Sequence, residues 1–391
     1  MTEAIGIRRR SFASRVVGRG SVVWRMDWLL FGAVVALSAV GTLLVWSATR
    51  TWSSIEPTGM AKKHVLNLLI GLALYSAVAV TDYRWLRTYA PVLYGIAVLG
   101  LILVISPMGS TINGHHSWIL LGGGFALQPA ELMKPALVVM LARLLAPTSE
   151  KGKKTKDRPR AAGLALSLAA AGAAAALVML QPDLGTTMVL MATTGAIIVF
   201  SGIRKRWVVA GVLLTGLAAV AVWSLGLLKP YQVARFTALI DPSSDPRGVG
   251  YNSTQALVAI GSGEVFGKGL FHGGQTTGRF VPEQHTDFIF TVAGEELGFV
   301  GSVTVVALLG VVLLRGARIA RMCGDRFSAL VSAGIVAWLA FQTLVNVGMT
   351  IGIMPITGVP LPFVSYGGTA TFANMTAIAI LQAIHLRSRP V

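Results

Sequence analysis

The stretch "WLLFGAVVALSAVGTLLVWSA" (28–48) contains no Asp, Glu, Lys or Arg. A helix that crosses the hydrocarbon core of a bilayer needs about 20 mostly apolar residues, so this stretch is predicted to span a membrane. Comparable runs recur outward from it, and we predict about ten spanning helices. They lie at roughly 28–48, 64–81, 89–106, 129–146, 161–180, 184–201, 207–228, 287–314, 327–351 and 367–386. The predicted fold class is an all-α integral membrane protein.

The composition agrees with this fold class. Of the 391 residues, 54% are hydrophobic and only 13% are charged, whereas a soluble domain carries about 25% charged residues. A chain with so few charges cannot cover its surface with groups that favour water, so most of that surface is expected to face lipid.

The basic residues predict the orientation of the helices. Most of the 33 Lys and Arg residues fall in alternate connecting segments, and such segments lie in the cytoplasm. Both termini are therefore predicted to be cytoplasmic, with tails at 1–26 and 387–391 and a membrane domain at 27–386. Because the basic residues are dispersed over several segments, the net charge of +17 predicts contact with anionic lipid headgroups, and no nucleic acid partner is expected.

Two segments outside the apolar runs are distinctive. The long external segment 229–286, between the predicted seventh and eighth helices, is rich in Gly and aromatic residues. Long loops between elements are usually functional or disordered, and within this one Ser253–Gly261 is predicted to form a short interfacial helix. The stretch "GVPLPFVSYGG" (358–368) is predicted to be an irregular loop that shapes a cavity.

Ionisable residues at membrane depth are functional candidates because their burial costs free energy. In "QPAELMK" (128–134), Glu131 and Lys134 are three residues apart and share a helix face. One interpretation is that they line a cavity in which Lys134 meets a phosphate. The other is an internal ion pair, and the two are compatible.

A second candidate is "VPEQHTDFIF" (281–290), at the outer mouth of an apolar helix. Asp287 is a candidate general base that takes a proton from a sugar hydroxyl, with Glu283 and His285 near enough to tune it. The alternative is that Thr286 or Asp287 caps the following helix, and spacing alone favours the cap. One of the next glutamates along that helix, Glu295 or Glu296, is expected to partner a basic group.

The remaining candidate site residues lie in sequence patterns that are less specific for a function. Asp183 is expected to cap a helix. Trp118 is an interfacial anchor or a platform for a sugar ring, and His115 with His116 is too little for a metal site. The external cations can hold a pyrophosphate or be ordinary surface residues: Lys229, Arg235, Arg247, Lys268 and Arg279.

Taken together, these stretches resemble the SEDS family, named for shape, elongation, division and sporulation. The resemblance rests on "DPSSDPRGVGYNSTQALVAIGSG" (241–263), "VPEQHTDFIFTVAGEELGFVG" (281–301) and "MPITGVPLPFVSYGG" (354–368), with "NGHHSWILLG" (113–122) and "QPAELMK" in support. It covers 27–386 and implies ten helices in a bacterial plasma membrane. The stretch "GKGLFHGGQTTGRFVPEQHTDF" (267–288) is more similar to RodA-type elongation members than to FtsW-type division members.

The resemblance implies a peptidoglycan glycosyltransferase that acts on lipid II and pairs with a class B penicillin-binding protein, a transpeptidase. A growing glycan on polyprenyl pyrophosphate would pass to the 4-hydroxyl of an incoming lipid II. A lipid II flippase and a non-catalytic scaffold are the rival functions. The candidate charges lie at the outer side rather than at the midplane, which favours the enzyme.

The resemblance also implies roles for individual residues. The family's essential carboxylate carries over to Asp287, which reverses the preference for a cap, and the family's Trp, Glu and Lys carry over to Trp118, Glu131 and Lys134. Ser117 stands where many members have Arg, so Arg50 or Lys268 is a candidate to contact the donor. Departure of pyrophosphate needs positive charge, from these side chains or from a divalent cation such as Mg²⁺ or Mn²⁺.

Overall fold

The computed structural model describes residues 22–52, 55–112, 115–122, 125–146, 161–226, 230–242, 245 and 248–388. Most of the predicted N-terminal tail, 1–26, and all but the first two residues of the C-terminal tail, 387–391, lie outside these ranges.

Every predicted apolar run is a helix in the described chain. These helices are α3 (Trp28–Thr49), α4 (Gly59–Val80), α5 (Arg84–Ile105), α6 (Pro129–Leu145), α7 (Ala161–Leu180), α8 (Leu184–Phe200), α9 (Lys205–Ser224), α13 (Ile289–Met322), α14 (Arg326–Thr350) and α15 (Gly368–Ser388). Within the described residues, seven of them are long and apolar enough to cross a membrane, namely α3, α4, α5, α7, α13, α14 and α15. The mainly helical fold is confirmed, while the count of ten spans and the cytoplasmic termini stay predictions.

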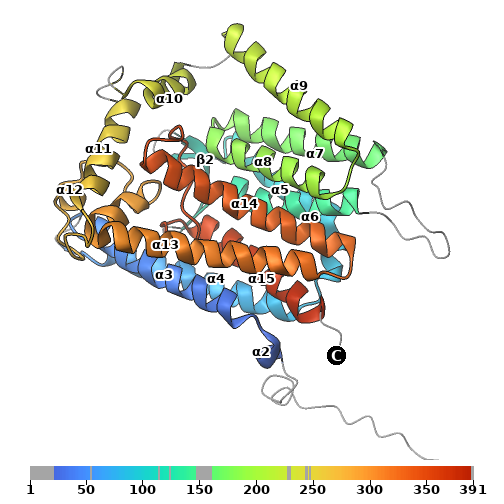
Figure 1. The fold of residues 1–391 in the computed structure, drawn as a ribbon, viewed down its shortest axis with the longest axis horizontal. Helices are drawn as coiled ribbons and strands as arrows, with labels where there is room; N and C mark the ends of the chain where they lie inside the picture. The colour runs from blue at the N-terminus through green and yellow to red at the C-terminus, as the bar shows by residue number, and fades with distance from the viewer. Residues whose placement is uncertain are drawn as a thin grey trace, which may run out of the picture.

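Helix α15 forms the centre of the bundle. It packs against α4, α6, α13 and α14, and 89% of its most apolar window is buried. A helix that is apolar all round is stable only when neighbours surround it. Helix α9, in contrast, lies at the edge of the bundle beyond α7 and α8 (Figure 1).

The long segment predicted to be an external loop, 229–286, is largely helical in its described residues. It contains α10 (Pro230–Ile240), α11 (Val249–Ser262) and α12 (Gly274–Gly278), which gather at one end of the bundle, on the left in Figure 1. The predicted helix at Ser253–Gly261 is confirmed as part of α11. The remaining short helix, α2 (Val22–Arg25), lies at the opposite end.

A small antiparallel sheet precedes α6 and was not predicted. Its strands are β1 (Ser110–Ile112), β2 (His115–Gly122) and β3 (Phe125–Leu127), in the order β1-β2-β3. It packs against α5, α6 and the start of α15.

Helix α13 is broken at Gly298, where φ is +67° and ψ is −165°. The loop after α11 lies across the break, and a Cβ at position 298 would overlap the backbone of Gly267. Backbone hydrogen bonds join loop and helix: Lys268 N–H to Glu295 O (3.0 Å), Gly269 N–H to Glu296 O (3.0 Å), Phe299 N–H to Glu264 O (2.9 Å) and Val300 N–H to Val265 O (3.1 Å). The loop therefore replaces helical hydrogen bonds that the break removes.

Candidate functional site

The turn at 282–288 presents Asp287 just before α13. Its side chain is half-buried, between the buried residues His285 and Phe288. The N-cap of α13 is Phe288, with no side-chain cap bond, and the hydroxyl of Thr286 donates to Glu283 instead (3.2 Å). The prediction that Thr286 or Asp287 caps this helix is therefore wrong.

The irregular loop between α14 and α15 closes on Asp287 from the other side. This loop, at 351–367, has no helix or strand, as predicted. A Cβ at Gly358, where φ is +76°, would sit 3.2 Å from Asp287 Oδ2. Asn346 of α14 donates from Nδ2 to the carbonyl oxygens of Asp287 and Val359, each at 2.7 Å.

Two further elements complete the surroundings of Asp287. Asp183 accepts from the N–H of Thr186 at 2.8 Å, which confirms it as the cap of α8. The start of α8 packs on the same irregular loop, since a Cβ at Gly185 would sit 2.7 Å from Thr357 O. Arg235 of α10 donates to that Thr357 oxygen at 3.4 Å.

These surroundings determine the acidity of Asp287. The pKa of this carboxyl is raised to about 7, mainly by burial and also by the negative charges of Glu283 and Asp183, while Arg235 and a hydrogen bond from Thr286 act in the opposite direction. A general base works best when its pKa lies near the working pH. The carboxyl is thus suited to accept a proton near neutrality.

His285 anchors the turn at 282–288 by packing against two aromatic side chains. Its ring lies 4.5 Å from that of Trp52 and 5.7 Å from that of Tyr366, centroid to centroid. The N–H of Tyr366 donates to the carbonyl oxygen of His285 at 2.9 Å. Burial lowers the pKa of His285 to about 4, so the imidazole is neutral at pH 7. Glu283 is exposed, with φ at +49°, and strained backbone of this kind clusters at functional sites.

Cations lie at the C-terminal end of α3, next to this turn. The Arg50 guanidinium donates to the carbonyl oxygen of Phe271 and lies 5.2 Å from the ring centroid of that residue. Its Nε is buried, and the Nε–H donates to no acceptor among the described residues. Arg279 donates to Thr51 O and lies 5.9 Å from the ring centroid of Trp52. Guanidinium groups with free donors suit an anionic phosphate.

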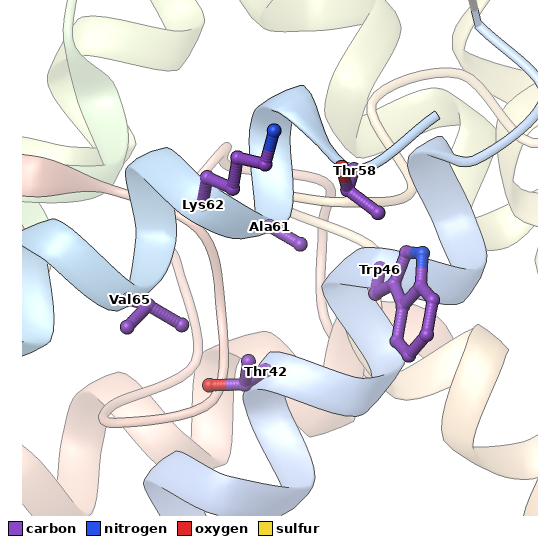
Figure 2. Close-up of a pocket in the computed structure, with 6 residues that line it drawn as sticks. All are labelled: Thr42, Trp46, Thr58, Ala61, Lys62 and Val65. Carbon is purple, nitrogen blue, oxygen red and sulfur yellow. The ribbon is translucent and has the colours of Figure 1, made fainter. Parts of the chain in front are cut away.

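A groove of about 360 Å³ lies between α3 and α4 (Figure 2) and is lined by Thr42, Trp46, Thr58, Ala61, Lys62 and Val65. Its walls are almost entirely apolar. Trp46 also packs on Phe271, with ring centroids 4.9 Å apart, and Phe271 is the residue that holds Arg50. The groove therefore leads toward the cations at the C-terminal end of α3.

Glu131 and Lys134 form a buried ion pair. Lys134 Nζ lies 2.6 Å from Glu131 Oε1, and the two side chains are 1% and 3% exposed, respectively. Lys134 also donates to Gln342 Oε1 at 3.2 Å and lies 5.6 Å from the ring centroid of Trp338. The structure matches the ion-pair interpretation, and a contact between Lys134 and a phosphate stays a prediction.

Lys268 forms a second ion pair. Its Nζ lies 3.0 Å from Oε1 of Glu295, which is fully buried, and Glu295 also accepts from the N–H groups of Gln275 and Thr276 at 2.8 Å. Glu295 is thus the glutamate that partners a basic group, as expected. A role for Lys268 toward substrate stays a prediction.

Trp118 lies in β2, opposite Ser110 of β1, and is half-buried. It is carried by the sheet that packs on α5 and α6, and it lies far from the turn of Asp287 in sequence. Lys229 and Arg247 fall outside the described residues. Among the described residues, no group of three or more His, Cys, Asp or Glu is placed to hold a metal ion.

Comparisons with known proteins cover nearly the whole chain. The model of the FtsW, RodA and SpoVE family, described as "Cell cycle protein", matches residues 27–390. "Stage V sporulation protein E" of Bacillus subtilis is 35% identical over 93% of this chain and 98% of its own. "Peptidoglycan glycosyltransferase MrdB" of Escherichia coli is 36% identical over 88% and 90%, respectively.

Solved structures share the fold. A chain of a complex described as "Structural coordination of polymerization and crosslinking by a peptidoglycan synthase complex" superposes with a TM-score of 0.76 at 30% identity, covering 92% of this chain and 97% of that one. The crystal structure of the Thermus thermophilus rod shape determining protein RodA gives a TM-score of 0.66 at 29% identity, covering 92% and 96%.

Proposed function

This chain belongs to the SEDS family of multi-pass bacterial membrane proteins, and on that premise we propose that it is a peptidoglycan glycosyltransferase that polymerises lipid II at the outer face of the plasma membrane. The observation that carries the proposal is Asp287, a half-buried carboxyl with a pKa raised to about 7. It lies just before the apolar helix α13, among outer loops that supply cations.

In the proposed reaction the 4-hydroxyl of an incoming lipid II attacks the anomeric carbon of the growing glycan. Asp287 takes the hydroxyl proton as the new glycosidic bond forms. The bond from the anomeric carbon to the pyrophosphate breaks, and polyprenyl pyrophosphate leaves with the electron pair. The glycan is then one disaccharide unit longer.

We assign stabilisation of the leaving pyrophosphate to Arg50 and Arg279. Arg50 ends α3 and Arg279 donates to Thr51 just beyond it, and Trp52 packs between Arg279 and His285 of the Asp287 turn. Donors aimed at developing charge are often the largest contribution to catalysis. A divalent cation, Mg²⁺ or Mn²⁺, remains part of the proposal as an aid to this departure. No step is assigned to it, and chelation of the purified enzyme tests it.

The polyprenyl chain is assigned to the groove between α3 and α4. That groove is apolar and passes Trp46, which packs on the Phe271 that holds Arg50. An isoprenoid tail in the groove would place its pyrophosphate near the cations. The tail would meet membrane lipid along its length, so it need not leave the bilayer.

The proposed partner is a class B penicillin-binding protein that cross-links the new strands. A chain that resembles this one over 97% of its length belongs to a peptidoglycan synthase complex in which polymerisation and crosslinking are coordinated. A role in elongation is proposed over division or sporulation because of the RodA-type stretch at 267–288.

Purified protein with labelled lipid II, with and without the partner, tests the function. We expect glycan strands from the wild type and none from Asp287→Asn. If the wild type moves lipid II across vesicles without making glycan, the protein is a flippase. If Asp287→Asn still makes glycan, Asp287 is not the base.

A further inference from the structure

Asn346 of α14 holds two distant segments with one atom. It is fully buried, and its Nδ2 donates at 2.7 Å to the carbonyl oxygen of Asp287 and at 2.7 Å to that of Val359. A side-chain amide nitrogen carries two N–H donors. Both are therefore used, one on the turn before α13 and one on the irregular loop before α15.

The place where these segments meet is the carboxylate of Asp287. Gly358, the residue before Val359, is so close to it that a Cβ would sit 3.2 Å from Oδ2. No helix or strand fixes the backbone of Asp287, because residues 282–288 form a turn. The bridge through Asn346 therefore sets how Asp287 lies against Gly358.

We propose that Asn346 is a positioning residue for proton transfer, which aims the Asp287 carboxylate by tying its backbone to the loop at 357–359. The inference rests on the proposed function, since it concerns the same base. Asn346 itself contacts backbone oxygens and need not touch substrate.

Gln342 provides a matched control on the same helix. It lies one turn earlier, is also fully buried, and donates from Nε2 to the carbonyl oxygen of Pro360 at 2.8 Å. It thus braces the same loop one residue farther along. Its oxygen accepts from Trp338 and Lys134, and it makes no hydrogen bond to the turn of Asp287.

The experiment measures kcat and KM for labelled lipid II across about pH 5 to 9, with full-length Asn346→Ala, Asn346→Ser and Gln342→Ala. We expect Asn346→Ala to lower kcat by roughly 10- to 100-fold, the effect of a small misplacement of a reacting group, with KM nearly unchanged. Freed from the bridge, the turn admits water, so the acidic limb of the kcat profile should move to lower pH. Asn346→Ser keeps one donor and should fall between.

The pH profile separates positioning from loss of structure. Groups that also act on Asp287 are Glu283, Asp183 and Arg235, and none of them is altered in these variants. Gln342→Ala should lower the melting temperature but leave the limb in place. A limb that moves equally in Gln342→Ala, or a wild-type profile in Asn346→Ala, overturns the proposal.

A second variant keeps the test decisive if Asn346→Ala does not fold. Gly358→Ala puts a methyl group against Oδ2 without altering the side chain of Asn346, so it should lower kcat and move the same limb. Unchanged kinetics in Gly358→Ala would overturn the proposed geometry. Asp287→Asn in the same assay separates the two proposals. If Asp287→Asn is active, Asp287 is not the base. If Asp287→Asn is inactive but Asn346→Ala has the kinetics of the wild type, only the positioning role of Asn346 is excluded.

Discussion

Replacing Asp287 by Asn should abolish polymerisation and at the same time stabilise the fold above pH 7. Burial raises the pKa of this carboxyl from 3.8 to about 7. Because the folded value lies above the unfolded one, the contribution of Asp287 to stability is complete below pH 3.8 and is lost as the pH rises through about 7. Asn cannot ionise, so the variant avoids that loss.

The magnitude follows from the pKa difference. At about 1.4 kcal/mol per pH unit, a pKa of about 7 in place of 3.8 corresponds to an upper bound of about 4 kcal/mol. The side chain is only half-buried, so water screens part of this and we expect about 1–2 kcal/mol. The melting temperature at pH 8 should therefore rise by a few degrees, while at pH 5 the gain should be much smaller.

The assay is thermal unfolding of purified wild type and Asp287→Asn in detergent at both pH values, with lipid II polymerisation measured on the same samples. Asp325→Ala is the control, because it removes the cap of α14, whose carboxylate accepts from the N–H of Ser328 at 3.0 Å. Such a cap is worth about 0.5–2 kcal/mol, and its loss should lower the melting temperature at both pH values. A variant that is no more stable than wild type at pH 8 would refute the claim that burial costs the ionised carboxylate free energy.

Three further predictions follow from other contacts. Lys134→Met leaves the Glu131 carboxylate buried without its partner and should destabilise the protein by roughly 3–5 kcal/mol; thermal unfolding that matches wild type would contradict this. Arg50→Ala removes a donor from the proposed pyrophosphate site and should lower kcat/KM for lipid II by about 10²-fold with little change in melting temperature, whereas wild-type kinetics would exclude Arg50 from the site. Gly298→Ala should displace the loop at 264–269 and expose it to protease, so an unchanged digestion pattern would count against the steric argument.

The membrane helices could be predicted from the sequence because the bilayer fixes both their length and their composition. The end of α13 could not: the apolar run stops at 314, but the helix continues to Met322. Its extension carries Arg315, which donates to Asp27 at 2.6 Å. In the sequence, a charged stretch after an apolar run resembles a cytoplasmic loop. Only the structure shows that Arg315 has an ion-pair partner, Asp27, at the start of α3. The sheet before α6 was missed because two of its three strands have only three residues each and the sheet is stabilised by pairing, which leaves little local signal.

The site was predicted only in part, for a similar reason. Spacing alone showed that Glu131 and Lys134 share a face, and the resemblance identified Asp287. The cap prediction failed because α13 begins at Ile289, after a turn that is held by its own backbone hydrogen bonds. In this turn the N–H groups of Thr286, Asp287 and Phe288 all donate to the carbonyl oxygen of Glu283. Asn346 and Gly358 carry no sequence signal of their role, since they reach Asp287 only through tertiary contacts between segments far apart in the chain.

The break at Gly298 means that the segment between α9 and α13 is not an interchangeable module. Its backbone completes the hydrogen bonding of α13, so a chimera that grafts α11, α12 and their connecting loop onto a relative must carry residues up to about 300 with it. A chimera joined at the start of α13 would separate the loop at 264–269 from the backbone groups of α13 that it pairs with. Carbonyl and amide groups from both proteins would then lack hydrogen-bond partners, and the chimera should fail to assemble even if each part has its native sequence.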